Sequence, residues 1–140
     1  MVSRSGDLPS HVLEQLAHSA RAVQAQAYAP ASKFRVGAAV LADDGRIFSG
    51  CNVENASYGL TICAERAAVF HAVANGVRAI RAVAVVTDLV EPARPCGACR
   101  QVLAEFGPSM HVYMLGLSGA SVATSLDRLL PDPFTFHSWP

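Results

Sequence analysis

The sequence predicts a three-layer α/β/α sandwich, in which a mixed five-stranded sheet carries helices on both faces. A strong turn signal, Asp44-Gly45, separates two strand-like segments and predicts an antiparallel hairpin. Farther along the chain, helical and apolar strand-like segments alternate, which favours a sheet covered by helices. With 140 residues, 51% apolar and 16% charged, the chain suits a single domain spanning residues 1–140.

Three helices are expected. Apolar residues recur at helical spacing from Ser10, a candidate N-cap, to about Ala27. An Ala-rich segment, Cys63 to Asn75, runs unbroken up to Gly76, which stands where a C-cap glycine belongs. The third helix, over residues 96–106, follows a proline and precedes Gly-Pro.

Five strands are expected, and one of them is more apolar than the rest. Residues 80–87 are nearly continuously apolar and β-branched, which predicts a central strand buried on both faces. A last helical turn is expected over residues 126–130, before two prolines. The remaining strand-like segments are residues 34–41, 47–53, 111–117 and 121–124.

Charge and composition exclude several classes of protein. Lys+Arg and Asp+Glu balance at 11 each without runs of either sign, which favours a small neutral ligand over nucleic acid. No stretch approaches the roughly 20 apolar residues of a membrane span, and the polar N-terminus is unlike a signal peptide. A cytoplasmic protein without membrane partners is predicted, and its four cysteines are expected to be thiols rather than disulfides.

Three cysteines and a glutamate coincide with the starts of two predicted helices. Cys96 and Cys99 are three residues apart and share a helix face, where the positive helix end favours the thiolates that bind zinc. Cys63 and Glu65 are two apart and do not face the same way, so one of them must do another job. With Cys63 as the third ligand, Glu65 becomes a proton carrier beside bound water, the pattern of catalytic zinc.

Two further points concern this metal site. Three thiolates and one Zn²⁺ sum to about −1, and we hypothesise that Arg66 and the helix N-termini offset this charge. A closed structural site with Cys51 as fourth ligand is an alternative, as is redox chemistry of the Cys-x-x-Cys pair.

The motifs Cys-Ala-Glu-Arg from Cys63 and Pro-Cys-Gly-Ala-Cys-Arg-Gln from Pro95 resemble the all-cysteine branch of the zinc-dependent cytidine deaminases. Residues 34–39, 52–55 and 129–131 are similar to the same family, in the same order. The resemblance implies a cytidine deaminase-like fold, one Zn²⁺ per subunit, and a homotetramer with shared sites, in which Ala56 and Tyr58 reach a neighbour's ligand.

The resemblance also implies an activity, namely hydrolytic deamination of cytidine and 2′-deoxycytidine to uridine and 2′-deoxyuridine plus ammonia, in pyrimidine salvage. Glu65 would carry protons to the ring nitrogen and to the departing amine. Asn52 and Glu54 would hydrogen-bond the ribose hydroxyls, and Phe34 would pack against the pyrimidine. The backbone N–H of Ala64 is a candidate donor to the attacking oxygen.

A C-terminal aromatic residue is expected to close the site. Phe134 stands at the family's distance from Leu-Leu-Pro, but Phe136 is an alternative because the usual glycine is replaced by Thr135.

Three other functions compete with nucleoside deamination. A deaminase of an aminonucleoside antibiotic such as blasticidin S shares the zinc motifs but is expected to lack the Asn-Val-Glu-Asn sequence found at residues 52–55. A deaminase of RNA or DNA is disfavoured by the neutral charge. A non-enzymatic interaction protein stapled by zinc is the third alternative.

Overall fold

The structure is a computed structural model that describes residues 7–136. Its elements in chain order are α1 (Ser10–Gln24), β1 (Val36–Ala42), β2 (Ile47–Cys51), the 3-10 turn η1 (Tyr58–Leu60), α2 (Ala64–Ala74), β3 (Ile80–Thr87), α3 (Gly97–Phe106), β4 (His111–Leu115), the 3-10 turn η2 (Leu117–Gly119), β5 (Ser121–Ser125) and α4 (Leu126–Leu129).

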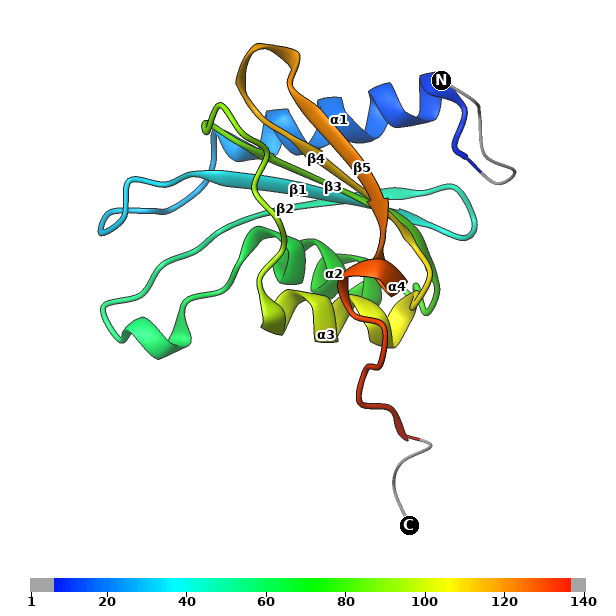
Figure 1. Ribbon diagram of the computed structural model, residues 1–140. Helices are drawn as coiled ribbons and strands as arrows, with labels where there is room; N and C mark the ends of the chain where they lie inside the picture. Colours follow the sequence, from blue (N-terminus) through cyan, green and yellow to red (C-terminus); the bar gives the residue numbers. More distant parts are fainter. Residues whose placement is uncertain (1–6, 137–140) are drawn as a thin grey trace.

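The strands form one five-stranded mixed sheet in the order β2-β1-β3-β4-β5. The hairpin partners β1 and β2 are antiparallel, and β1 is also antiparallel to β3. The pair β3 and β4 is parallel and is joined through α3, since parallel neighbours need a crossover connection, and β5 returns antiparallel to β4. The predicted mixed sheet is confirmed, and β3 is its central strand, as its apolar sequence predicts (Figure 1).

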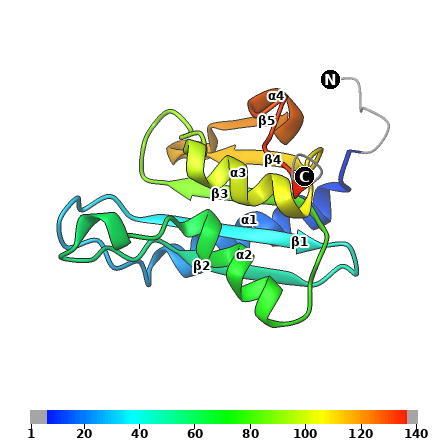
Figure 2. The same cartoon turned by 90° about the horizontal axis from the view of Figure 1, so that it is seen from below.

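Helices cover both faces of the sheet, which confirms the predicted sandwich. In Figures 1 and 2, α1 lies on one face, and α2 and α3 lie on the other. Side chains of β1 alternate between these two layers, as the two-residue period of a strand requires. Ala39 and Leu41 belong to the cluster that contains Leu16 of α1, whereas Ala38 and Val40 belong to the cluster that contains Val69 of α2 and Leu103 of α3.

A glycine lets β2 approach α2 closely. A Cβ atom built on Gly50 lies 2.3 Å from the backbone nitrogen of Ala68 and 2.9 Å from the backbone oxygen of Ala64. Such contacts leave no room for a side chain. Gly50 therefore sets the distance at which the first turn of α2 lies over the sheet.

Several predicted boundaries differ from the structure by one to three residues, most clearly those of the first helix and the first strand. The first helix ends at Gln24 rather than Ala27, and Pro9 is its N-cap residue, so Ser10 is the first helical residue and not the cap. The first strand begins at Val36 rather than Phe34, because the side-chain amide of Asn52 bonds the backbone at both of these residues.

None of the helices within residues 7–136 is long and apolar enough to cross a membrane.

Candidate active site

The N-termini of α2 and α3 bring three thiols together. Cys63 is the N-cap residue of α2, Cys96 is the N-cap residue of α3, and Cys99 is buried in the first turn of α3. The Sγ atoms of all three lie within 4.8 Å of one another, and those of Cys63 and Cys96 are 3.9 Å apart. The predicted ligand cysteines therefore meet at one point.

Nearby donors stabilise negative charge on this cluster. The backbone N–H of Cys99 donates to Cys96 Sγ at 3.5 Å, and Nη2 of Arg66 donates to Cys63 Sγ at 3.4 Å. Hydrogen bonding by the Cys99 thiol, and then by Arg66, lowers the pKa of the Cys63 thiol. The same contact with Cys63 raises the pKa of the Arg66 guanidinium, so the two groups favour each other's charged forms.

The cluster fits zinc in both chemistry and spacing. In a tetrahedral site, sulfurs about 2.3 Å from zinc lie about 3.8 Å apart, close to the 3.9 Å between Cys63 Sγ and Cys96 Sγ. The Nε atom of Arg66 is buried without a hydrogen-bond partner among the described residues, in keeping with a guanidinium that faces anionic ligands.

The fourth cysteine lies on the other face of the sheet. Cys51 is paired in register with Gly37, and residues directly opposite on paired strands share a face. A Cβ atom built on Gly37 meets the backbone oxygen of Ala20 in α1, so this face is turned toward α1. The closed four-cysteine site is therefore wrong, and three thiols leave one metal position open.

Glu65 lies beside the thiols in the first turn of α2 and is only 5% exposed. Burial raises the pKa of its carboxyl group, and the Cys63 thiolate acts in the same direction. The backbone of Ala64, which precedes it, is also buried at the helix N-terminus. A buried carboxyl group next to an open metal position suits proton transfer.

The side chain of Asn52 supports the entry to β1. Its Oδ1 accepts from the backbone N–H of Val36 at 2.9 Å, and its Nδ2 donates to the carbonyl of Phe34 at 2.8 Å. Asn52 is 8% exposed, and Phe34 is partly buried against the core beneath α2 and α3. The amide thus fixes the backbone that carries the Phe34 ring.

Glu54 joins two loops that lie side by side in Figure 1, one from α1 to β1 and the other from β2 to α2. Its Oε1 accepts the backbone N–H groups of Ala31 at 2.8 Å and Ser32 at 3.2 Å, and its own N–H donates to the carbonyl of Tyr28 at 2.8 Å. A hydrogen bond from the Ser32 side chain, followed by these backbone N–H groups, lowers the pKa of the Glu54 carboxyl group.

The remaining predicted residues lie at the surface. Ala56 and Tyr58 belong to the loop between β2 and α2, and Tyr58 is 78% exposed. Phe134 and Phe136 are 60% and 63% exposed in the C-terminal segment, so exposure does not choose between them.

Two residues at the end of the metal motif, Arg100 and Gln101, were given no role from the sequence alone. Arg100 Nη1 donates to the carbonyl of Leu129 at 3.0 Å, and Gln101 Nε2 donates to the carbonyl of Phe134 at 2.8 Å. Both residues directly follow Cys99 in the motif. Their place in the motif was the only feature of the sequence that pointed to a role near the metal site.

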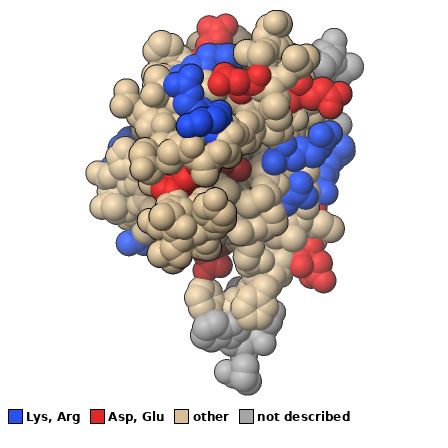
Figure 3. Space-filling view, turned by 90° about the vertical axis from the view of Figure 1, so that its left-hand side faces the viewer, with Lys and Arg blue, Asp and Glu red and all other residues tan. Residues whose placement is uncertain are grey.

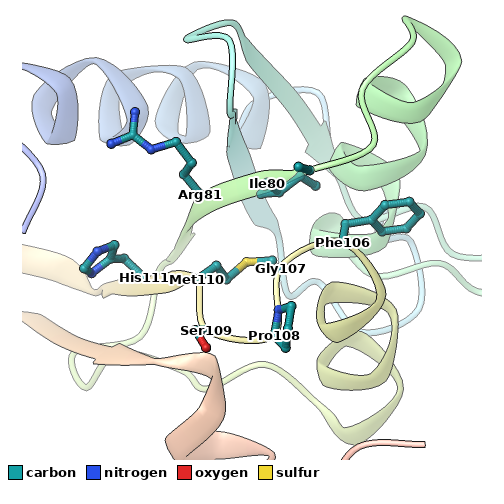
Figure 4. A pocket seen from close by; sticks show the side chains of 9 residues that line it. Ile80, Arg81, Phe106, Gly107, Pro108, Ser109, Met110 and His111 are labelled. Atoms are coloured by element: carbon teal, nitrogen blue, oxygen red, sulfur yellow. The ribbon is translucent and has the colours of Figure 1, made fainter. Parts of the chain in front are cut away.

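Other surface features lie apart from this cluster. A pocket at the other end of the sheet is lined by Ile80, which begins β3, and by residues 106–111, at the end of α3 and the start of β4 (Figure 4). It contains none of the predicted site residues. The face seen in Figure 3 carries separate small groups of basic and acidic side chains within a largely uncharged surface.

The fold and the three-thiol cluster together fit a zinc-dependent enzyme, because three protein ligands leave one metal position open. Residues 10–115 match the family model described as "Cytidine and deoxycytidylate deaminase zinc-binding region". The chain is 52% identical to a cytidine deaminase of Sporosarcina psychrophila over 88% of this chain and 91% of the relative. It is 30% identical to a blasticidin-S deaminase of Bacillus cereus over 74% of this chain and 79% of the relative.

A solved structure of a cytidine deaminase from Burkholderia pseudomallei has the same fold, with a TM-score of 0.83 and 50% identity over 86% of this chain and 98% of that one. The chain belongs to the cytidine deaminase family, and its cofactor is zinc. It is therefore an enzyme of the zinc-dependent cytidine deaminase class.

Proposed function

We propose that this enzyme acts on free nucleosides, converting cytidine and 2′-deoxycytidine to uridine and 2′-deoxyuridine plus ammonia in pyrimidine salvage. One observation carries the catalytic part of this proposal: the buried Glu65 lies beside three thiols that leave one metal position open. A structural zinc staple needs four protein ligands and has no use for a buried carboxyl group beside them.

The proposed roles follow from the position of each group. Cys63, Cys96 and Cys99 would hold the zinc, which would supply a Lewis acid to acidify the attacking water. Glu65 would take one proton from the water and pass it to the ring nitrogen, and it would then take the second proton from the hydroxyl added at C4 and give it to the departing amine. One carboxyl group serves as base and acid because it regains its initial state in each cycle. The N–H of Ala64, at a helix N-terminus, is the donor to the attacking oxygen.

Arg66 is proposed to balance the charge of the ligands. Its 3.4 Å contact with Cys63 Sγ supports this role, because a cation facing thiolates reduces the excess negative charge of the metal site. With zinc bound, a less negative site would acidify water more effectively.

The proposed sugar contacts use hydrogen-bonding capacity that remains on two side chains. Asn52 bonds the backbone through one lone pair and one N–H, which leaves a second acceptor position and a second donor. Oε1 of the Glu54 carboxylate accepts the backbone N–H groups of Ala31 and Ser32, and Oε2 is proposed to accept from a ribose hydroxyl. The Asn52 amide holds the backbone of Phe34 through its carbonyl, and the Phe34 ring is proposed to pack against the pyrimidine.

We also propose an oligomeric state and a cellular location for the enzyme. A homotetramer would let Ala56 and the exposed Tyr58 reach a ligand in a neighbouring subunit, and burial of Tyr58 there would remove apolar area from water. Phe134 is proposed to close the site. A cytoplasmic location suits the chemistry, since a reducing compartment keeps the metal-binding cysteines as thiols.

A spectrophotometric assay on cytidine, 2′-deoxycytidine, cytosine and blasticidin S tests the proposed substrates. We expect turnover of both nucleosides and far slower turnover of the free base, which lacks the sugar that Asn52 and Glu54 would bind. Turnover of blasticidin S alone would favour the antibiotic deaminase, and absence of turnover with every compound would favour the non-enzymatic zinc protein. Light scattering of the purified protein tests the tetramer.

A further inference from the structure

The C-terminal segment is attached to the helix that carries two of the metal ligands. Gln101 Nε2 donates to the carbonyl of Phe134 at 2.8 Å, and Arg100 Nη1 donates to the carbonyl of Leu129 at 3.0 Å. Both donors follow Cys99 directly in α3. The last residue of α4 and the segment that follows it are thus each held by a residue next to the metal site.

Arg100 links this attachment to the start of the metal motif. Its Nε donates to the carbonyl of Pro95 at 2.8 Å, so the same guanidinium bonds the residue before Cys96 and the last residue of α4. Leu129 and Leu130 also pack against the core beside α3. Beyond Leu130, the hydrogen bond from Gln101 holds a segment whose residues 131, 132, 134 and 136 are exposed.

We propose that Gln101 is a positioning residue for the aromatic closure of the active site. Its bond to the Phe134 carbonyl places the backbone from which the Phe134 ring extends, and it selects Phe134 rather than Phe136 as the closing residue. Gln101 acts through Phe134 and does not touch the substrate. The inference rests on the proposed closure of the site by this segment.

The test compares two substitutions that differ in hydrogen-bond donation. Gln101→Met keeps an unbranched side chain of similar length and removes the donor, whereas Gln101→Lys keeps a donor at comparable reach. Gln15→Met, at an exposed position of α1 on the other face of the sheet, is the matched control. Each variant is assayed for zinc per chain, for kcat and KM with cytidine, and for amide hydrogen exchange over residues 131–136.

We expect Gln101→Met to raise KM about fivefold, the effect of losing one neutral hydrogen bond, with kcat and zinc content nearly unchanged. Amide exchange over residues 131–136 should become faster, because the segment loses an attachment. Gln101→Lys should restore KM and slow exchange, and the control should resemble the wild type.

A double-mutant cycle identifies the residue through which Gln101 acts. In a Phe134→Ala background, Gln101→Met should raise KM no further, whereas in a Phe136→Ala background it should keep its full effect. The inference is overturned if Gln101→Met leaves both KM and exchange unchanged, or if its effect disappears with Phe136→Ala instead. Faster exchange without any change in KM would retain the attachment but refute its role in closing the site.

Discussion

Nη2 of Arg66 lies 3.4 Å from the Sγ atom of Cys63, three residues earlier at the start of α2. Residues three apart on a helix are neighbours on one face, so the local sequence alone produces this pair. The contact places a cation beside one of three clustered thiols. This is the position from which Arg66 would offset the excess negative charge of three thiolates on one Zn²⁺.

Removal of the Arg66 cation should slow catalysis more than it weakens folding. We expect Arg66→Ala to reduce kcat/KM by about ten- to a hundredfold, the usual effect of losing a group that tunes metal ligands. Steady-state kinetics with zinc analysis measures this, and Arg21→Ala at an exposed position of α1 is the control. Unchanged kinetics in Arg66→Ala would show that the thiolate charge needs no offset.

Cys96 and Cys51 lie on opposite faces of the sheet, so serine substitutions at these two positions should give opposite results. Cys96→Ser should lose zinc and activity, because Cys96 belongs to the three-thiol cluster. Cys51→Ser should retain one zinc per chain and near-normal turnover, because Cys51 faces α1. Metal content of the purified variants decides the matter, and loss of zinc from Cys51→Ser would restore the four-cysteine site.

The carboxylate of Glu54 should make stability depend on pH. Its folded-state pKa is lowered, first by the Ser32 side chain and then by the backbone N–H groups of Ala31 and Ser32. A lowered pKa stabilises the fold above the usual glutamate value of about 4.3, and this contribution is lost as the pH falls through the folded-state pKa.

We therefore expect Glu54→Gln to lower Tm at pH 7 and to approach the wild-type Tm at acid pH. Thermal unfolding from pH 7 to pH 3 measures the difference, and Glu105→Gln on the exposed side of α3 is the control. A Tm difference that stays constant over this range would contradict the role assigned to the carboxylate.

Gly50 should tolerate no side chain. A Cβ atom there lies 2.3 Å from the backbone nitrogen of Ala68, so Gly50→Ala must push α2 away from the sheet. We expect a loss of about 1–3 kcal/mol in the free energy of unfolding, together with weaker zinc retention because α2 carries Cys63 and Glu65. Gly59→Ala, where a Cβ meets nothing within 4 Å, is the matched control in urea unfolding.

Local sequence signals predicted the elements that carry the site. Helix α2 ends as Gly76 predicts: Gly76 has a φ of 91° and the N–H of Val77 bonds back to the carbonyl of Ala72. The starts of α2 and α3 differ by one residue from prediction, because Cys63 and Cys96 are N-cap residues. The hairpin of β1 and β2 and the central strand β3 were likewise predicted from local sequence, namely from Asp44-Gly45 and from the apolar residues 80–87.

Contacts between distant segments were beyond local sequence signals. The first strand begins at Val36 because the Asn52 amide bonds Phe34 and Val36 from 16 to 18 residues away. The bond from Gln101 to the Phe134 carbonyl spans 33 residues and depends on where the chain lies after α4. Neither has a periodicity or turn signal, so each required the three-dimensional structure.

The division of labour between Cys63 and Glu65 is the central claim, and one variant tests it most directly. Glu65→Gln keeps the shape of the side chain and removes its ability to carry a proton. We expect purified Glu65→Gln to hold one zinc per chain while kcat for cytidine falls by about 10²–10⁴-fold, the range of general acid–base catalysis. Zinc loss in this variant would make Glu65 a metal ligand, and wild-type turnover would remove it from catalysis; either result would contradict the mechanism.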